Sequence, residues 1–330
     1  MKRRTFTARA AAAIAGAAVV SLGAPDVARA TAPPRIGWIS SARRDPDSQF
    51  LAALRHGLRE LGRLEGRDYQ IDTWWAEDAV DGPDRVVAEM LRSNPDLIVT
   101  QGPIVFNVQR ARVAQPVLFS FSGDPVEAGL VDSLARPGRQ LSGISMLSLE
   151  LVGKRIEALA AVMPGLRKVA VVSNPGHAGE RSELATTRAA VSAAGLEMEY
   201  LPLRGDAELD PTLANALRAN CQALVVFADA GMVRRSERFA AFALQHRRPA
   251  VSGWAEFARR GNLMSYGPNV LQVYRRLASF VDRVLKGTRP AELPVELPTV
   301  IEHVINLRAA RAMQLEIPRS VLLRADELIE

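Results

Sequence analysis

The sequence of 330 residues contains one cysteine, Cys221, and four histidines. A single cysteine forms no intrachain disulfide and cannot supply a zinc site of several cysteines. The histidines stand at positions 56, 177, 246 and 303, without the close spacing of metal ligands carried on one element. We therefore expect no metal centre and no cofactor, and we expect Cys221 to be a small buried apolar residue.

The chain also lacks a large excess of charge once its first residues are set aside. Its formal net charge is +6, but residues 1–30 hold five basic residues and one acidic residue, which leaves 37 basic and 35 acidic residues in the rest. A nearly neutral body provides no basic face for nucleic acid. The 48% hydrophobic and 24% charged residues are typical of a soluble globular protein, and the length suits about two domains.

Signatures of common enzymes are missing. The sequence has no G-x-S-x-G elbow, no P-loop and no G-x-G-x-x-G after its first predicted strand, where the turn at residues 40–46 is unsuited to a dinucleotide. His177 follows an Asn-Pro-Gly turn, but no orienting partner for it is evident. We therefore expect a protein that is not an enzyme.

Residues 1–30 have the pattern of an export signal. Lys2, Arg3 and Arg4 precede an apolar stretch at residues 10–22, and Ala-Arg-Ala at residues 28–30 is typical of a cleavage site. The stretch is short for a membrane span, and no later run of 18 apolar residues exists. We predict export to the periplasm. Residues 3–6 resemble a twin-arginine signal, so the general and the twin-arginine route both stay open.

After residue 30, short apolar runs alternate with amphipathic helical patterns. Continuous apolar strands separated by helices predict parallel sheets that are covered on both faces. The pattern occurs twice, over about 110 residues each time, so we predict an α/β protein with two Rossmann-like doubly wound lobes. The predicted strands are residues 35–40, 69–75, 96–100, 116–121 and 141–144 in the first set, and 168–173, 196–201, 223–228, 249–252 and 263–265 in the second.

The last part of the chain extends beyond these two sets. A strongly amphipathic helix is predicted at residues 270–285, followed by a strand at 300–306 and a helix at 307–313. A segment that follows two complete lobes indicates that the chain crosses back between them and forms a hinge. We assign residues 1–30 to the signal peptide, 31–146 plus about 267–297 to lobe 1, and 147–266 plus about 298–330 to lobe 2.

Small polar residues and turn formers follow the predicted strands. In open parallel sheets, ligands bind beyond the carboxyl ends of the strands, where helix N-termini favour anions. Hydroxyl groups and helix ends suit a carboxylate, and acidic side chains suit an ammonium group, so a cleft lined in this way fits a small zwitterion. The predicted ligand-binding residues are Ser40, Ser41, Thr100, Gln101, Asp124, Asn174, Asp229 and Glu256.

The same residue types have a second interpretation. Asp124 before a proline, and Asn174 before Pro-Gly, are also ordinary turn formers and helix caps. Trp38 alternates inside a strand and is expected in the core. Trp254 precedes a short helix near the strand ends, so both a place in the core and a place against an apolar part of the ligand stay open.

Several motifs resemble those of the ABC transporter substrate-binding proteins, a family with tryptophan- and phenylalanine-binding members. The resemblance covers the chain from residue 35 to its end. The quoted motifs include IGWISS (36–41), GDPVEAGLVDSLARPG (123–138), VVSNPGH (171–177) and WAEFARRGNLMSYG (254–267). The family often has T-G-G-T-P after the third strand, where this chain has T-Q-G-P-I at residues 100–104, so the ligand need not be an aromatic amino acid.

The resemblance implies a type I periplasmic-binding fold that closes around a small-molecule solute. It further implies delivery of an amino-acid-like solute to an ABC permease and ATPase complex by a monomer. A sensor subunit that binds a solute and signals to a membrane receptor is the alternative, and an enzyme on the same fold is a weaker one. No feature of the sequence separates import from sensing.

Overall fold

The computed structural model describes residues 32–77, 82–147 and 149–330. The predicted export signal lies outside the described residues. Pro33–Glu330 forms one compact unit, built on two β-sheets. Among the described residues, no helix is long and apolar enough to cross a membrane.

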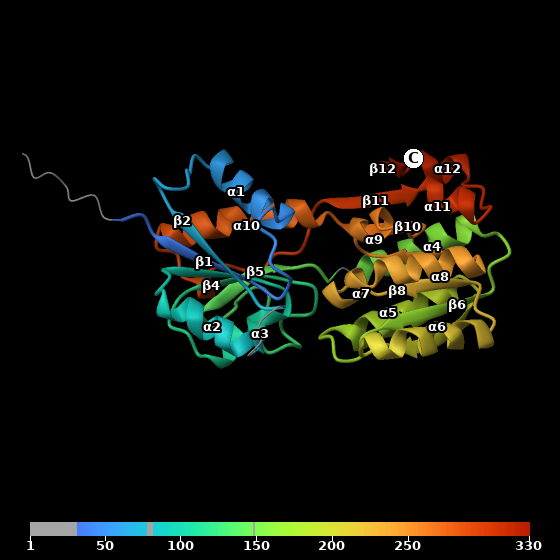
Figure 1. Ribbon diagram of the computed structural model, residues 1–330, viewed down its shortest axis with the longest axis horizontal. Coiled ribbons are helices and arrows are strands. Elements are labelled where there is room, and N and C mark those ends of the chain that lie inside the picture. Colours follow the sequence, from blue (N-terminus) through green and yellow to red (C-terminus); the bar gives the residue numbers. More distant parts are fainter. Residues whose placement is uncertain (1–31, 78–81, 148) are drawn as a thin grey trace, which may run out of the picture. The chain divides into compact units, whose positions relative to one another are not determined.

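The first sheet has five parallel strands in the order β2-β1-β3-β4-β5. Figure 1 shows α1 and α10 on one side of this sheet and α2 and α3 on the other. The strands are β1 (Arg35–Ser40), β2 (Gln70–Trp75), β3 (Leu97–Gln101), β4 (Val117–Phe121) and β5 (Leu141–Ser145). The helices around the sheet are α1 (Gln49–Glu60), α2 (Gly82–Arg92), the 3-10 turn η1 (Gly102–Ile104), α3 (Val105–Arg110) and α10 (Val270–Leu285).

Alternation along the strands divides the core of this sheet into two layers. Ile36 and Trp38 of β1 pack into the cluster that contains buried residues of α1 and α10, whereas Ile39 packs into the cluster with α2 and α3. Successive side chains of a strand point to opposite faces, so an almost wholly apolar strand is needed to fill both layers. The placement of Trp38 in the core is confirmed, since the residue is fully buried.

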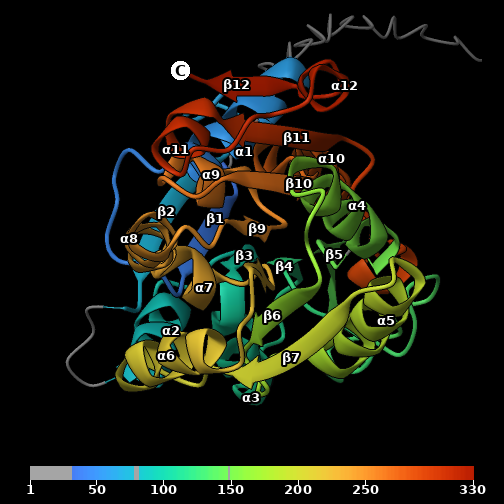
Figure 2. The same ribbon diagram turned by 90° about the vertical axis from the view of Figure 1, so that its right-hand side faces the viewer.

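The second sheet has seven strands in the order β12-β11-β10-β9-β8-β6-β7. Figure 2 shows β12 and β7 at its two edges. The strands are β6 (Lys168–Ser173), β7 (Glu197–Pro202), β8 (Ala223–Val226), β9 (Ala250–Ser252), β10 (Met264–Pro268), β11 (Ile301–Asn306) and β12 (Glu327–Ile329). The helices around them are α4 (Val152–Val162), α5 (Glu180–Ala193), α6 (Leu209–Arg218), α7 (Ala230–Arg234), α8 (Ser236–His246), α9 (Ala255–Arg259), α11 (Leu307–Ala312) and α12 (Arg319–Leu322), with 3-10 turns η2 (Leu149–Leu151) and η3 (Asp206–Glu208). The 3-10 turn η4 (Pro290–Glu292) packs on β5 of the first sheet instead.

Three local features differ from the predictions. The helix expected at residues 233–246 is two helices, α7 and α8, which meet at Arg235. The pair β10–β11 is antiparallel, because β11 enters the second sheet after the chain has run along the first sheet as α10. The short elements α12 and β12 carry too few apolar residues for a periodic pattern. Cys221 is buried, as predicted.

The chain passes between the two sheets three times: after β5, before α10 and before β11. Helix α10 packs on α1 and on the first sheet. The backbone N–H of Asn269, at the second crossing, donates to the carbonyl of Val300 at the third, over 3.0 Å. Glu296, which precedes the third crossing, exchanges backbone hydrogen bonds with Ser145 and Gly143 of β5. The crossings are therefore bonded to one another or to the first sheet.

Candidate ligand-binding cleft

A cavity of about 610 Å³ is lined by residues from both sheets. The first sheet contributes the ends of β2, β3 and β4 and the start of α1, and the second contributes α7, α9 and β11. Carboxyl ends of parallel strands are the usual place for ligands in open α/β sheets. The cavity therefore lies where the order of strands and helices predicts a ligand.

Aromatic rings form much of the apolar wall of this cavity. Phe50, Trp75, Trp254 and Tyr274 all line it. The Tyr274 ring is buried, and its centroid lies 5.1 Å from that of Phe50 and 5.6 Å from that of Trp38. Burial raises the pKa of Tyr274, so the ring stays neutral. Aromatic rings offer large apolar surfaces with little side-chain freedom to lose when a ligand binds.

Charged groups of both signs surround these rings. Arg234 of α7 lies 3.8 Å from Glu77, which follows β2. Glu256 and Arg260 form an ion pair of 2.8 Å. Asp45 and, on β11, Glu302 are the other two carboxylates of the lining. A cavity with both charge signs and apolar walls suits a ligand that carries a cation, an anion and an apolar part.

Uncharged polar groups complete the lining. Gln101, Ser120 and Ser122 follow or end neighbouring strands of the first sheet. The Gln101 Oε1 atom is buried and accepts no hydrogen bond from the described residues. A buried acceptor without a partner costs free energy, so this atom is available to a donor group of a ligand.

A loop that follows β4 of the first sheet contacts a loop that follows β6 of the second sheet. Ser122 Oγ lies 2.8 Å from His177 Nε2, and the backbone N–H of Asp124 donates to the carbonyl of Ala178 over 3.2 Å. Arg181 reaches Glu127 at 3.3 Å. Burial lowers the pKa of His177, against the opposing effect of nearby carboxylates. The neutral ring of His177 therefore meets the Ser122 hydroxyl.

The helix α5, which follows the loop of His177, takes part in a buried ion pair. Arg155 Nη1 lies 2.9 Å from Glu183 Oε1, and Arg155 Nε donates to the carbonyl of Tyr266 over 2.9 Å. Both charged side chains are almost fully buried, and burial raises the pKa of Glu183. This pair joins α4, α5 and β10 below the cleft.

These features are those of a protein that encloses a small solute between two α/β lobes. A family model described as ABC transporter substrate binding protein matches residues 46–329. The chain belongs to this family of substrate-binding proteins. The predicted fold class, two doubly wound lobes of the type I periplasmic-binding kind, is confirmed by the two sheets and by the solved structures that the chain resembles.

Individual relatives are distant in sequence but similar along most of the chain. A tyrosine-binding protein of Clostridioides difficile (strain R20291) is 22% identical over 261 residues, which are 78% of this chain and 74% of that protein. An ABC domain from Streptococcus pneumonia, solved in complex with L-Trp, has a TM-score of 0.81 at 21% identity and covers 90% of this chain and 100% of its own. A conserved domain protein from Vibrio cholerae also has a TM-score of 0.81, at 23% identity, over 89% of this chain and 99% of its own.

In this substrate-binding protein, the predicted ligand-binding residues divide into two groups. Gln101 and Glu256 line the cavity. Ser40, Ser41 and Thr100 lie at the same strand ends, but their hydroxyl groups bond to the chain itself. Ser40 Oγ accepts from the N–H of residue 42, Ser41 Oγ donates to the carbonyl of Gln101 over 3.0 Å, and Thr100 Oγ1 donates to that of residue 118 over 3.5 Å.

Asp124, Asn174 and Asp229 bond to their own loops. Asp124 Oδ1 accepts from the N–H groups of residues 126 and 127, Asn174 Oδ1 from that of residue 176, and Asp229 Oδ1 from that of residue 232. For Asp124 and Asn174 these are the turn and cap roles that the sequence left open beside ligand binding. Asp229 is the N-cap of α7, a role that was not predicted from the sequence. Trp254, whose place was also left open, precedes α9 of the second lobe, lines the cavity and packs against the core cluster of the first sheet.

Sequence reasoning did not single out Phe50, Tyr274, Asn269 and Glu302. Phe50 and Tyr274 belong to the apolar faces of two predicted helices, and such faces are expected to pack in the hydrophobic core. Tyr274 does pack in the core, and it also lines the cavity. Asn269 begins the predicted helix of residues 270–285, where an N-cap is expected. Glu302 is a charged residue within the predicted strand at residues 300–306. A charge in a strand that is otherwise largely apolar was the one sequence feature that could have indicated a functional residue there.

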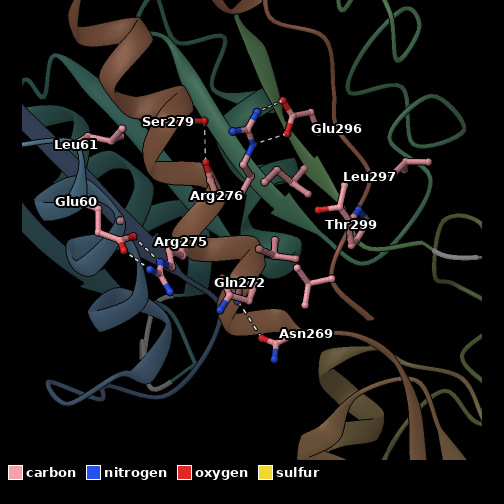
Figure 3. A pocket seen from close by; sticks show the side chains of 15 residues that line it. Glu60, Leu61, Asn269, Gln272, Arg275, Arg276, Ser279, Glu296, Leu297 and Thr299 are labelled. Carbon is pink, nitrogen blue, oxygen red and sulfur yellow. Dashed lines mark hydrogen bonds and ion pairs between the residues drawn. The ribbon is translucent and has the colours of Figure 1, made fainter. Parts of the chain in front are cut away.

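A second cavity, of about 630 Å³, lies between α1, α10 and residues 296–300. Figure 3 shows its two ion pairs, Arg275 with Glu60 and Arg276 with Glu296, each joined by two contacts. Both guanidinium groups therefore already face a carboxylate. The lining of this cavity comes from α1, β5, α10 and residues 296–300, whereas the cleft is lined from both sheets, so the cleft is the better candidate for the solute.

Proposed function

We propose that this protein binds an amino acid or a similar small zwitterionic solute in the cleft. The observation that carries the proposal is one cavity, lined from both lobes, that combines aromatic walls with charges of both signs. An amino acid presents an ammonium group, a carboxylate and a side chain, and the cavity has a complementary group for each. The tyrosine-binding relative and the structure solved with L-Trp support this substrate class.

The proposal includes closure of the lobes on the ligand. A ligand that contacts both lobes favours the closed arrangement because its contacts are complete only there. We propose that Gln101 and Glu256 contact the solute directly, and that Ser40, Ser41, Thr100, Asp124, Asn174 and Asp229 hold the loops that shape the cleft. The lobes are assigned as residues 31–146 with about 267–297, and 147–266 with about 298–330.

The proposed biological role is solute capture for an ABC importer. The protein is exported under the direction of residues 1–30, works as a monomer without a catalytic step, and passes its solute to a membrane permease and ATPase. The family supports this role, and the leader pattern supports export. Dependence on a permease is tested by comparing solute uptake in cells with and without this protein; a permease and ATPase gene beside its own gene would favour import, and a lone kinase gene would favour sensing.

Calorimetric titration tests ligand binding directly. The protein is purified, unfolded to release any bound solute and refolded, and it is then titrated with the twenty amino acids, nucleobases and small carboxylates. We expect saturable binding of at least one amino acid, with a stoichiometry of one. Native mass spectrometry of protein purified without dialysis identifies a retained solute. A folded, ligand-free sample that binds no member of the panel contradicts the proposal.

A further inference from the structure

Glu302 is an acidic residue near the start of β11, and this strand places it in the lining of the cleft. It lies on β11 opposite Gly267 of β10, and it lines the cavity. Only 12% of its side chain is exposed. A carboxylate held in such surroundings loses hydration that the protein must replace with other contacts.

The protein replaces this hydration only in part. Glu302 Oε2 accepts from Asn269 Nδ2 over 2.9 Å and lies 3.9 Å from Arg259 Nη2. Among the described residues, none donates to Glu302 Oε1. Arg259 is committed elsewhere, since its Nη2 atom lies 2.6 Å from Glu327. Burial raises the pKa of Glu302, although Arg259 acts in the opposite direction.

The other carboxylates of the lining are better solvated or better paired. Glu256 has 29% of its side chain exposed and lies 2.8 Å from Arg260. Glu77 is 32% exposed and faces Arg234. Asp45 lies on an exposed turn and accepts from the backbone N–H of residue 47. Because a charge interacts more strongly in a less solvated place, a cation in this cavity gains most beside Glu302.

We propose that Glu302 accepts the ammonium group of the bound amino acid, an inference that rests on the proposed function. The free Oε1 atom supplies the acceptor, and the cavity supplies the space. Glu302 is also bonded to the hinge, because its partner Asn269 lies at the second crossing between the sheets. Asn269 donates to Glu302, accepts from the N–H of Gln272 as the N-cap of α10, and is bonded through its backbone to Val300. An ammonium group on Glu302 therefore acts on the two later crossings between the lobes.

The experiment compares ligands with and without the amino group. The probes are L-tryptophan, L-tyrosine and L-leucine, each beside its des-amino acid: indole-3-propanoate, 3-(4-hydroxyphenyl)propanoate and 4-methylpentanoate. Affinities are measured by calorimetry for the wild type, for Glu302→Gln, and for Glu199→Gln, which makes the same change on β7 at the other edge of the sheet.

We expect Glu302→Gln to weaken binding of the amine-bearing probe about tenfold or more, as for other buried charged hydrogen bonds. Binding of the matching des-amino acid should change by less than about threefold, and Glu199→Gln should bind both probes as the wild type does. Equal losses for both members of a pair, or no loss for either, overturn the assignment while the proposed function stands. A wild type that binds none of the amine-bearing probes overturns the assignment, and the titration with all twenty amino acids decides the proposed function separately.

A second measurement separates this role from a structural one. A carboxyl group whose pKa is raised in the fold contributes stability that is present at low pH and lost as the pH rises through that pKa. Near pH 7 the ligand-free Glu302→Gln protein should therefore be at least as stable as the wild type in thermal unfolding. A large fall in its melting temperature without ligand shows that Glu302 mainly supports the fold, and overturns the inference.

Discussion

The contact between Gly123 and Ala178 offers a direct test of lobe closure. A Cβ atom added at Gly123 would lie 2.2 Å from the carbonyl oxygen of Ala178, and real Cβ contacts are essentially never shorter than 3.0 Å. Gly123 does not have a left-handed backbone conformation, so alanine is not strained by its own φ angle. The added Cβ would also lie 2.9 Å from the Phe121 ring of the same lobe, so that ring has to shift slightly. Because the contact with the Ala178 backbone is much shorter, Gly123→Ala acts mainly by forcing the two loops apart.

The expected loss can be worked out from the bonds at this edge. The Asp124–Ala178 backbone hydrogen bond is already 3.2 Å long, and it breaks when the loops separate. The Ser122–His177 hydrogen bond, 2.8 Å long, is strained or lost as well. Each is worth about 1 kcal/mol net, so closure becomes about 1–2 kcal/mol less favourable. Because binding depends on closure, we expect an affinity about 5- to 30-fold weaker.

Calorimetric titration with the amino acid that binds the wild type most tightly provides the assay. Small-angle scattering of the saturated complexes should show that the variant closes less completely. Gly176→Ala is the matched control, since its added Cβ would meet only the Asn174 side chain, at 3.4 Å. Unchanged affinity in Gly123→Ala would refute the reasoning, as would a large fall in the melting temperature of the ligand-free variant, which would indicate damage within one lobe.

Three further predictions concern other parts of the cleft and its support. Trp254→Ala should weaken amino acid binding about tenfold and reduce the ligand-induced change in tryptophan fluorescence, with Trp75 of the same lining giving the remainder; an unchanged affinity and an unchanged fluorescence response argue against Trp254 as a wall. Arg155→Met should lower the free energy of unfolding by about 3–5 kcal/mol in urea denaturation, because it leaves a buried carboxylate unpaired, and Glu183→Gln should restore part of it; a loss below 1 kcal/mol is the contrary result. Burial lowers the pKa of His177, so its neutral form contributes stability that is complete above the ordinary pKa and is lost as the pH falls; between about pH 7.5 and 5.5 the melting temperature of wild type should drop more than that of His177→Gln, and parallel curves would contradict this.

The strands and most helices of this protein were predictable because a buried parallel sheet needs apolar side chains on both faces. Residues 35–40 and 168–173 show this need so clearly that their predicted bounds agree with β1 and β6. The helix at residues 270–285 was equally clear from its apolar stripe. The spacing of apolar residues in a sequence indicates which side chains are buried. These strands and this helix were predictable because each of them buries a large apolar face.

The side chains of the site were harder to predict because the same residue types serve two purposes. Asp124, Asn174 and Asp229 stand where ligands bind in this architecture, and their oxygens accept from the backbone N–H groups of their own loops. Sequence position cannot distinguish an oxygen that caps a loop from one that awaits a ligand. The distinction depends on which donors the folded chain brings within 3 Å.

Hydrogen-bond accounting therefore locates the ligand better than the kinds of residue at the strand ends do. Most polar groups around this cleft are satisfied by the protein, including the serines after β1 and the arginines beside α9. Among the described residues, Gln101 Oε1 on the first lobe is buried without a hydrogen-bond partner. On the second lobe, Glu302 accepts at Oε2 only, on a side chain that is 12% exposed. An acceptor without a donor costs free energy where water solvates it poorly, so a ligand that brings donor groups to both walls of the cavity is favoured. A ligand with donor groups, such as an amino acid, meets this requirement, whereas a purely anionic or apolar solute leaves both acceptors unsatisfied.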